Sequence, residues 1–296
     1  MNNQEPLVSI LMLTYNHKDF IAKALESIIT QDYTNIEIVV GDDSSIDKTQ
    51  EILKEYQKKY PDIIKLILHP TNLGITKNSN SVLNECNGKY IFFLAGDDLM
   101  LPGKIQKQVE FMEKNHQCSL CYHSLEVFDS DTNQTLFYSY AKKMGTIKEV
   151  IKDGTFFGSC SVVLRAKDIP QKGYDNRIPI ASDWLICIDT LVNGGTVEYI
   201  DEVLGRYRRH SGNITKIRKD YNNEIDLLNT CNIAMLNYPQ YAKEALYRYS
   251  EILASMRFRD EDKYLHFLKL SLKVNFRLKY FVCFFLYIFS FGKIKK

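Results

Sequence analysis

An apolar run that ends in two adjacent carboxylates constrains the fold of this chain more than any other feature. Residues 90–96 read Tyr-Ile-Phe-Phe-Leu-Ala-Gly, Asp97 and Asp98 follow at once, and Pro102 opens a helix-like stretch. A buried strand of this kind delivers its carboxylates to the crevice at the carboxyl end of an open α/β sheet, where such sheets bind ligands. Mg²⁺ or Mn²⁺ is usually held there by one or two carboxylates together with substrate phosphates. Taken alone, the segment is also compatible with a strand that ends in an acidic turn.

The rest of the N-terminal half alternates apolar runs with helical patterns. Continuous apolar runs of strand length are followed by stretches whose apolar residues recur at helical spacing. This alternation predicts right-handed βαβ units and a mostly parallel sheet, and continuous apolar strands indicate a sheet covered on both faces. The expected strands are residues 7–13, 36–40, 63–68 and 89–94, and the expected helices are residues 19–30, 44–56 and 79–86.

The second half of the chain is less regular. Strands are expected at residues 118–128 and 159–164, a helix at residues 184–191, and an irregular, Tyr-rich stretch at residues 129–157. After residue 215 the pattern is helical without strands. We therefore expect a catalytic domain over residues 1–215 and a helical C-terminal region over residues 216–296.

Composition and charge narrow the functional classes. The 45% apolar and 25% charged residues are typical of a globular protein. The seven cysteines include one close pair, Cys118 and Cys121, without a second pair at zinc-ligand spacing, as in a reduced, cytosolic protein. The first residues lack the features of a signal peptide. Residues 263–296 contain eight Lys or Arg and no Asp or Glu, whereas the remainder carries 30 basic and 36 acidic residues, so the acidic body argues against nucleic-acid binding.

Three separate strand ends carry polar side chains. Residues 14–16 (Thr-Tyr-Asn) follow the first apolar run, residues 42–43 (Asp-Asp) follow the second, and residues 97–98 follow the fourth. In a parallel sheet all three lie along one edge, so a single ligand site explains them better than three independent turns. Neither a Gly-x-Gly-x-x-Gly loop nor a P-loop follows the first strand, which weakens a dinucleotide or P-loop assignment.

The ordered set of motifs resembles the family 2 glycosyltransferases, which are inverting enzymes with the GT-A fold. The set comprises Val-Ser-Ile-Leu-Met-Leu-Thr-Tyr-Asn at residues 8–16, Val-Val-Gly-Asp-Asp-Ser-Ser at residues 39–45, Asn-Leu-Gly at residues 72–74, and Gly-Asp-Asp at residues 96–98 before Pro102. Each motif alone is weak, but their order over roughly residues 6–210 is specific. The resemblance implies an α/β, nucleotide-diphospho-sugar transferase-like fold, with a mostly parallel sheet flanked by helices and a C-terminal helical extension.

The resemblance also implies the residues that bind a nucleotide sugar. Tyr15 and Asp43 resemble the residues that hold the base, Asp97 the carboxylate near the ribose, and Asp98 the metal ligand on the diphosphate. A bound Mn²⁺ or Mg²⁺ stabilises the charge that grows on a departing diphosphate without a proton donor. The expected substrate-binding set also includes neighbouring strand-end residues and the loop that usually closes on the nucleotide: Thr14, Asn16, Asn72 and Asn78.

An inverting transfer needs one general base to take the proton of the acceptor hydroxyl. Asp183 is the candidate, because family members carry an acidic residue followed by an aromatic at this point before a helix, and Trp184 is expected to contact the substrate. The alternative is that Asp183 only caps the following helix. Asp175 is the less favoured base, and Asp189 is expected to point elsewhere.

A basic segment, Gly-Arg-Tyr-Arg-Arg-His-Ser at residues 205–211, resembles the end of the catalytic domain in bacterial relatives. Arg206, Arg208 or Arg209 is a candidate diphosphate ligand, because guanidinium matches phosphate geometry in a bidentate fashion. His210 is a candidate to assist the metal or the leaving group, and a solvated basic turn is the alternative. The chain lacks the Gln-x-x-Arg-Trp pattern and the multiple membrane spans of processive synthases, so addition of a single sugar is expected.

The C-terminal tail combines aromatic and basic residues. Residues 280–291 are nearly all apolar, and Lys or Arg residues lie on both sides of them. Twelve residues are too few to span a bilayer, which needs about 20. The pattern predicts a segment that lies against anionic lipid, and a core helix docked on the catalytic domain is the alternative.

Together these features predict a metal-dependent glycosyltransferase in the cytoplasm, peripherally associated with the inner face of the cell membrane. It would transfer one hexose or N-acetylhexosamine from a UDP-sugar, with inversion, to a polyprenyl-diphosphate-linked glycan in cell-surface polysaccharide or O-antigen biosynthesis. One rival is a sugar-phosphate nucleotidyltransferase, which would release pyrophosphate instead of UDP. The other is a non-catalytic scaffold of a membrane glycan-assembly complex.

Overall fold

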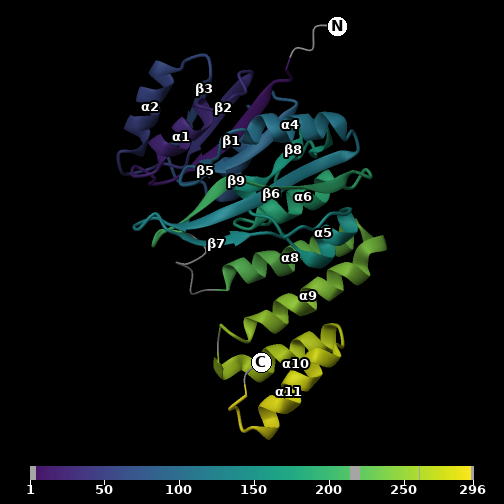
Figure 1. Ribbon diagram of the computed structural model, residues 1–296. Coiled ribbons are helices and arrows are strands. Elements are labelled where there is room, and N and C mark those ends of the chain that lie inside the picture. Colours follow the sequence, from purple (N-terminus) through teal and green to yellow (C-terminus); the bar gives the residue numbers. More distant parts are fainter. Residues whose placement is uncertain (1–4, 214–220, 260, 295–296) are drawn as a thin grey trace. The chain divides into compact units, whose positions relative to one another are not determined.

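The apolar runs of the N-terminal half form the parallel part of a nine-stranded sheet in the computed structural model (Figure 1). These strands are β1 (Val8–Thr14), β2 (Ile36–Asp42), β3 (Ile64–Leu68) and β4 (Tyr90–Ala95). β1 pairs in parallel with both β2 and β4, and β2 pairs in parallel with β3. Each strand agrees with its expected range to within two residues, because its residues are mostly apolar; β1, β2 and β4 are largely buried, whereas β3 is mostly half-buried.

The other strands add a mixed second half to the sheet. They are β5 (Leu99–Met100), β6 (Cys118–Asp129), β7 (Thr135–Ser139), β8 (Val163–Arg165) and β9 (Thr196–Arg209). The strand order is β3-β2-β1-β4-β8-β6-β9-β5, and β7 pairs with β6. β8 is antiparallel to β4 and β6, whereas β6 and β9 are parallel. β7 lies in the stretch that was expected to be irregular, so that expectation was wrong for these five residues.

Helices follow the strands of the parallel half in alternation. They are α1 (Ile21–Ile29), α2 (Thr49–Lys59), α3 (Ile75–Leu83), α4 (Lys104–Lys114) and α6 (Ser182–Thr190), with short 3-10 turns at Ser159–Ser161 and Ala166–Asp168. In α1 the buried residues Ile21, Leu25 and Ile28 recur at helical spacing and join the core under the sheet. Burial of each such side chain contributes about 1.5–3 kcal/mol. The fold is therefore the mixed α/β arrangement that was expected.

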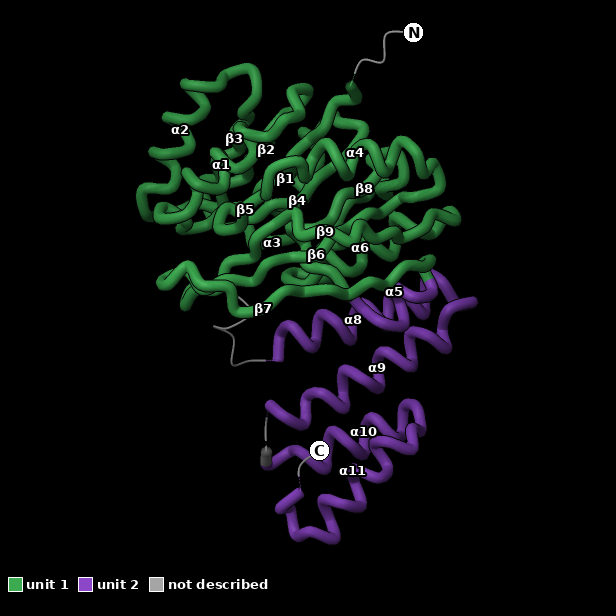
Figure 2. Tube along the Cα trace, in the orientation of Figure 1, with its two compact units in different colours: residues 1–147, 155–219 green, residues 148–154, 220–296 purple. Residues whose placement is uncertain are grey.

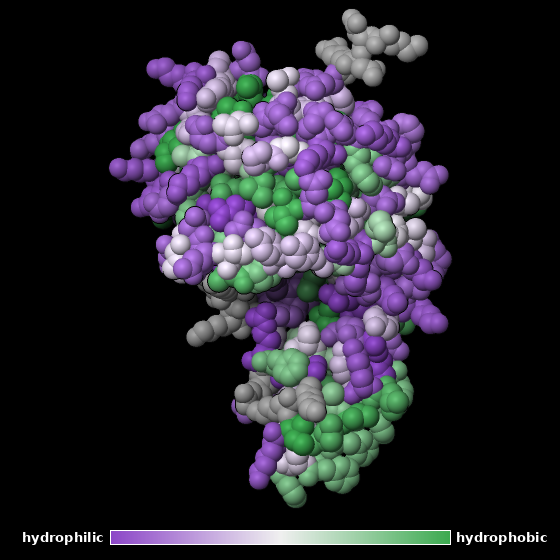
Figure 3. Space-filling model, viewed as in Figure 1, coloured by the Kyte–Doolittle hydropathy of each residue, from purple (hydrophilic) through white to green (hydrophobic). Residues whose placement is uncertain are grey.

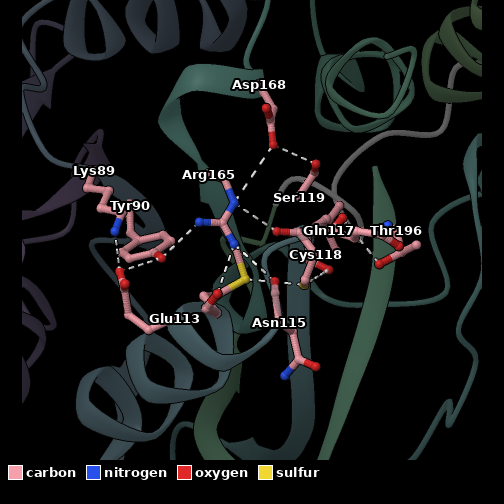
Figure 4. Close-up of polar contacts among 12 residues, drawn as sticks. Lys89, Tyr90, Glu113, Asn115, Gln117, Cys118, Ser119, Arg165, Asp168 and Thr196 are labelled. Atoms are coloured by element: carbon pink, nitrogen blue, oxygen red, sulfur yellow. Dashed lines mark hydrogen bonds and ion pairs between the residues drawn. The ribbon is translucent and has the colours of Figure 1, made fainter. Parts of the chain in front are cut away.

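A buried arginine ties the two halves of the sheet together. Arg165, at the end of β8, donates hydrogen bonds to the carbonyl oxygens of Cys118, Met112 and Asn115 at 2.9–3.1 Å (Figure 4). Its guanidinium also donates to the hydroxyl of Tyr90, on β4, at 3.0 Å. These bonds satisfy a buried cation whose loss would leave several carbonyls without partners. They fix β4, β6 and α4 around β8 at the amino end of β4, which is the end away from Asp97 and Asp98.

The structure describes residues 5–213, 221–259 and 261–294, and these fall into two compact units (Figure 2). The first unit, residues 1–147 and 155–219, contains the sheet, and the second comprises residues 148–154 and 220–296. The expected boundary at residue 215 lies outside the described residues. The helices of the second unit are α5 (Ile147–Asp153), α8 (Asn222–Asn237), α9 (Ala242–Met256), α10 (Tyr264–Val274) and α11 (Leu278–Phe289), with 3-10 turns at Pro239–Tyr241 and Glu261–Lys263.

The aromatic tail is the helix α11, and it has two apolar faces. Its inner face packs against α9 and α10, where the rings of Tyr287 and Tyr264 stack with centroids 4.5 Å apart. Its outer face is exposed, and Figure 3 shows hydrophobic surface gathered over α10 and α11. The exposed side chains are Leu278, Phe281, Val282, Phe285, Ile288 and Phe289. Within the described part of the chain, no helix combines the length and apolarity needed to cross a bilayer.

Candidate active site

The polar strand ends meet at one edge of the sheet. The backbone N–H of Asp43, just after β2, donates to the carbonyl of Thr14 at 3.0 Å. The backbone N–H of Gly96, just after β4, donates to the carbonyl of Leu13 at 2.8 Å. The ends of β1, β2 and β4 are therefore neighbours, as the crevice rule for parallel sheets requires.

Asp97 lies between two histidines at this edge. Its Oδ2 atom is 3.0 Å from Nε2 of His210 and 3.9 Å from Nε2 of His17. The side-chain amide of Asn213 donates to the same oxygen at 3.5 Å. Burial alone would raise the pKa of Asp97, but the hydrogen bond from His210 and the nearby imidazoles outweigh it and hold this pKa below its ordinary value. Asp97 is therefore a charged carboxylate surrounded by groups that favour its ionised form.

Asp98 occupies the opposite environment. Its side chain is only 1% exposed, and Oδ1 accepts the backbone N–H of Arg208 at 2.9 Å. Burial raises the pKa of Asp98 well above its ordinary value, and the charge of Asp97 raises it further, against the hydrogen bonds from Arg208 and the thiol of Cys160. Asp98 was expected to be the metal ligand. The structure places its carboxylate in the core, and Asp97, although also buried, is the less enclosed of the two.

Arg208 holds the two aspartates to the last strand. In addition to its backbone bond to Asp98, its side-chain Nε donates to the carbonyl oxygen of Asp97 at 2.7 Å. The guanidinium is buried between the rings of Phe20 and Phe128, at 4.8 and 4.6 Å from their centroids. This buried position makes Arg208 a support for the aspartates and not an open anion site.

The two other arginines of the basic segment have different surroundings. Arg206 makes a bidentate ion pair with Glu126, with Nε 2.9 Å and the second nitrogen 3.0 Å from the two carboxylate oxygens. Its guanidinium also lies 4.0 Å from the ring centroid of Phe128. The guanidinium of Arg206, a candidate ligand of the diphosphate, is therefore already paired with Glu126. Arg209 is half-buried, with its guanidinium 4.9 Å from the ring of Tyr207.

His17 is a site residue that the sequence reasoning missed. Burial lowers the pKa of His17, although the charge of Asp97 opposes this shift, so the imidazole is held neutral at neutral pH. Its Nδ1 atom is buried without a hydrogen-bond partner among the described residues. The available signal was its position directly after the Thr-Tyr-Asn strand end. Phe20, whose ring lies 4.8 Å from that of His210, was missed for the same reason.

Asp43 organises a loop. Its carboxylate oxygens accept the backbone N–H groups of Leu73 and Gly74 at 2.7 and 2.9 Å. The side-chain amide of Asn72 donates to the carbonyl of Asp43 at 3.1 Å. The loop at residues 72–74 therefore lies beside the end of β2, as expected. The carboxylate of Asp43, which was expected to bind the nucleotide base, instead accepts hydrogen bonds from this loop.

Asn78 and Thr14 are buried beneath the crevice. The amide nitrogen of Asn78 donates to the carbonyl of Gly41 at 3.0 Å, and its oxygen lies 3.1 Å from Nε2 of His69. A Cβ at Gly41 would lie 2.1 Å from that oxygen, so only glycine fits there. Thr14 is buried, and its hydroxyl has no hydrogen-bond partner within the described residues. The buried position of Asn78 indicates a support for the floor of the site, where a contact with the nucleotide was expected.

Tyr15 is the accessible side chain of the first strand end. It is 44% exposed. Asn16, the next residue, takes φ = 56°, and its side-chain oxygen accepts the backbone N–H of Ile46 at 2.9 Å. This turn presents the ring of Tyr15 to solvent, and an exposed aromatic ring is suited to stack on a planar base.

Asp183 lies in the first turn of α6 and is exposed to solvent. Protein encloses its other sides, and this burial raises the pKa of Asp183 despite the hydrogen bond that the carboxylate accepts from the N–H of Trp184 at 2.9 Å. Ala181 is the N-cap residue of α6, so Asp183 is not the cap that was considered as an alternative. An accessible carboxylate with a raised pKa has the properties of a general base.

The neighbours of Asp183 are mostly structural. Trp184 is 1% exposed and belongs to the core, so the expectation that it contacts substrate is not met by its position. Asp189 is buried and forms an ion pair with Lys172 at 2.6 Å, and Asp175 forms a bidentate pair with Arg177. Of the three aspartates, Asp183 is therefore the accessible carboxylate.

The donor atoms at the crevice suit a divalent cation that a diphosphate also binds. Among the residues described, no group of three or more His, Cys, Asp or Glu side chains is arranged to hold a metal ion by itself. One accessible carboxylate is nevertheless a usual protein contribution when substrate phosphates supply the remaining oxygens. Asp97 is buried, with 8% of its surface exposed against 1% for Asp98, so it is the less enclosed of the two carboxylates.

Residues 9–169 match the family described as glycosyl transferase family 2. The chain belongs to this family. Rv1520 of Mycobacterium tuberculosis, an uncharacterized protein, is 29% identical over 214 residues, or 70% of this chain and 60% of the relative. The chain therefore spans about 60% of the length of such mycobacterial relatives. The putative teichuronic acid biosynthesis glycosyltransferase TuaG of Bacillus subtilis is 27% identical over 215 residues, 73% of this chain and 84% of the relative.

Solved structures of glycosyltransferases share the fold. The crystal structure of S. aureus TarS in complex with UDP superimposes with a TM-score of 0.68 at 16% identity, covering 96% of this chain and 87% of the other. The mannosyltransferase PcManGT of Pyrobaculum calidifontis, in complex with GDP-Man and Mn²⁺, gives a TM-score of 0.59 at 14% identity, covering 98% and 86%. The GT-A fold expected from the sequence is confirmed.

Proposed function

We propose that this protein transfers a single hexose or N-acetylhexosamine from a UDP-sugar, with inversion, to a polyprenyl-diphosphate-linked glycan. The observation that carries the proposal is the crevice at the strand ends, where the charged Asp97 and the exposed Tyr15 lie at neighbouring strand ends. TarS has been crystallised with UDP and with UDP-GlcNAc, which supports a UDP-sugar as the donor. TuaG, a putative teichuronic acid biosynthesis glycosyltransferase, supports a role in polysaccharide biosynthesis, and the cell surface and O-antigen remain part of the proposal.

Donor binding is assigned to groups at the crevice. Tyr15 stacks on the uracil, and Asp43 acts through the loop it holds, whose Asn72 side chain lies beside the nucleotide. Asp97, and not Asp98, would hold Mn²⁺ or Mg²⁺ on the diphosphate, and His210 orients the Asp97 carboxylate through its hydrogen bond. The cation would act as a Lewis acid toward the leaving diphosphate. The Mn²⁺ in the PcManGT complex supports a divalent cation.

Asp183 is assigned as the general base. The acceptor hydroxyl oxygen attacks the anomeric carbon from the face opposite the diphosphate and forms the new glycosidic bond, while the bond to UDP breaks. The hydroxyl proton passes to the carboxylate of Asp183, and UDP leaves with the bonding electrons. The raised pKa of Asp183 makes it a stronger base than an ordinary aspartate, which suits proton abstraction in the transition state.

The membrane surface is the proposed second partner. The exposed outer face of α11 carries three phenylalanines, and the rings of Phe281 and Phe285 lie 4.6 Å apart. Residues 263–296 contain no Asp or Glu, so this surface is suited to anionic lipid. The inner face of α11 packs against α10, while its outer face remains exposed. The helix can therefore pack on the protein and still present an apolar face to lipid. Such a surface would bring the enzyme to a lipid-linked acceptor at the inner face of the cell membrane.

Donor screening tests the proposal. The full chain is incubated with Mn²⁺ and each of UDP-glucose, UDP-galactose, UDP-N-acetylglucosamine and UDP-N-acetylgalactosamine, and thermal shift and UDP release are measured. We expect one of these donors to raise Tm and to release UDP faster when a polyprenyl-diphosphate-linked sugar is added. Release of pyrophosphate from a sugar phosphate and UTP would instead support a nucleotidyltransferase. Absence of any release, with every donor and acceptor, would support the scaffold.

A further inference from the structure

The helix α3 connects the loop held by Asp43 to the segment that carries Asp183. Its N-terminal end follows Gly74, whose backbone N–H donates to the Asp43 carboxylate. Further along the helix, Thr76 and Asn80 bond to residues just before α6. The nucleotide side of the crevice and the proposed base are therefore linked through one short helix.

The first link is a chain of two buried hydroxyl groups. Oγ1 of Thr76 lies 2.6 Å from the carbonyl oxygen of Ile178 and 2.7 Å from Oγ of Ser182. A hydroxyl has one proton, so Thr76 donates to the carbonyl and accepts from Ser182. Both hydroxyls are almost fully buried, so water cannot replace either bond without cost. Ser182 directly precedes Asp183, and its position is thus fixed by α3.

The second link is a two-point clamp. The side-chain oxygen of Asn80 accepts the backbone N–H of Tyr174 at 2.8 Å, and its nitrogen donates to the carbonyl of the same residue at 2.9 Å. Tyr174 is itself buried. α3 therefore holds the segment before α6 at residue 174 and again at residues 178 and 182.

We propose that Thr76 and Ser182 are positioning residues that set the place of Asp183 relative to the bound donor. The inference rests on the proposed role of Asp183 as the base. A base must lie within hydrogen-bond reach of the acceptor hydroxyl, and a misplacement of about 1 Å can reduce turnover about 100-fold. Without the hydroxyl chain, the start of α6 loses its fixed distance from the loop that Asp43 organises, while the donor contacts themselves persist.

Thr76→Val tests the inference, because valine keeps the shape of threonine and lacks only the hydroxyl. We measure kcat, KM and the pH dependence of kcat for the UDP-sugar that gives the fastest UDP release, and the Kd of UDP by calorimetry. We expect kcat to fall at least tenfold while KM and the Kd of UDP change less than twofold. Thr76→Ser, which retains the hydroxyl, should restore turnover. The acidic limb of the kcat profile should stay in place in Thr76→Val, because Asp183 is already exposed to solvent and its carboxylate is unchanged.

Further variants separate positioning from stability and from the proposed function. Ser182→Ala removes one of the two bonds of the Thr76 hydroxyl, so it should lower kcat, though less than Thr76→Val, and the double variant should lower kcat no further than Thr76→Val. Ser81→Ala, which removes a hydroxyl bonded to the Lys77 carbonyl within α3, should leave kcat unchanged. If Asp183→Asn abolishes turnover but Thr76→Val lowers only Tm, the positioning inference is wrong and the proposed function stands. If Asp183→Asn retains turnover, both are wrong.

Discussion

Asp97 and Asp98 are adjacent in the chain and meet opposite environments. They follow β4 in a turn that the bond from the Asp98 N–H to the Ala95 carbonyl closes at 3.1 Å, and one carboxylate faces the two histidines while the other enters the core near Cys160. The pKa of Asp97 is lowered and that of Asp98 is raised, because the first is surrounded by imidazoles and the second is desolvated beside a like charge. The pair therefore divides into one carboxylate that favours its ionised form and one that favours its protonated form.

Isosteric substitution distinguishes the two aspartates. We expect Asp97→Asn to weaken Mn²⁺-dependent UDP binding at least tenfold, because the charge at the crevice is lost. Asp98→Asn keeps an oxygen that accepts the Arg208 N–H and should bind UDP and Mn²⁺ nearly as well as the parent. Isothermal titration of UDP with Mn²⁺ in each variant makes the comparison. The reverse pattern would reinstate Asp98 as the ligand.

The pH dependence of turnover reports on Asp183. The base must be deprotonated, so kcat falls as the pH decreases through its pKa. Because this pKa is raised in the folded protein, the acidic limb should lie above the ordinary aspartate value of about 3.9. We expect Asp183→Asn to abolish turnover with UDP affinity unchanged. Asp175→Asn serves as the control, since Asp175 is already paired with Arg177. The acidic limb of the kcat profile of this variant should match that of the parent.

At the scale of elements, the parallel strands could be predicted and the mixed half of the sheet only in part. β1 to β4 are mostly apolar, with few interruptions such as Glu37 and Lys65, which is why their ranges follow from the sequence. β9 intersperses charged residues such as Glu198, Asp201 and Arg206 among its apolar ones, so it lacks that signal. The site shows the same division. The strand-end positions were predictable, whereas the orientation of Asp98 and the engagement of Arg206 by Glu126 depend on contacts between residues 80 or more positions apart.

The turn before α3 offers a test at this scale. Gly74 takes φ = 84° and ψ = 163°, a region that is essentially restricted to glycine. We expect Gly74→Ala to lower the free energy of unfolding by about 1–3 kcal/mol and also to weaken UDP binding, because the Asp43 loop must shift. Gly194→Ala is the matched control, with φ = 96° and open space around its Cβ position, in the turn between α6 and β9. It should lose similar stability, measured by urea denaturation, and keep UDP affinity.

At the scale of the molecule, two units carry two kinds of surface. The sheet unit carries the polar crevice, and the helical unit carries an apolar face within a sequence region that has basic residues and no acidic ones. Exposed apolar surface of this extent is costly in water and usually marks an interaction site. The proposed function would use the first surface for the water-soluble donor and the second for the membrane that holds the acceptor.

Vesicle binding tests the outer face of α11. We expect Phe281→Ser with Phe285→Ser to reduce cosedimentation with phosphatidylglycerol vesicles at least tenfold, because each buried Phe contributes about 1.5–3 kcal/mol. Leu236→Ser, which removes a more exposed apolar side chain from α8, is the control and should bind like the parent. UDP release from the soluble donor should be unchanged in both. Equal binding by all three proteins would show that lipid contacts lie elsewhere.

The reciprocal bonds between Arg208 and the aspartate pair have a practical consequence for engineering. The arginine backbone is bound by one aspartate and its side chain binds the carbonyl of the other, across 110 and 111 positions of sequence. Consider a chimera that takes residues 96–102 from a relative but keeps the β9 strand of this chain. It would lose the hydrogen bonds between Arg208 and the two aspartates, and both carboxylates would be misplaced. Exchanges of donor specificity between relatives should therefore graft the two segments as one cassette.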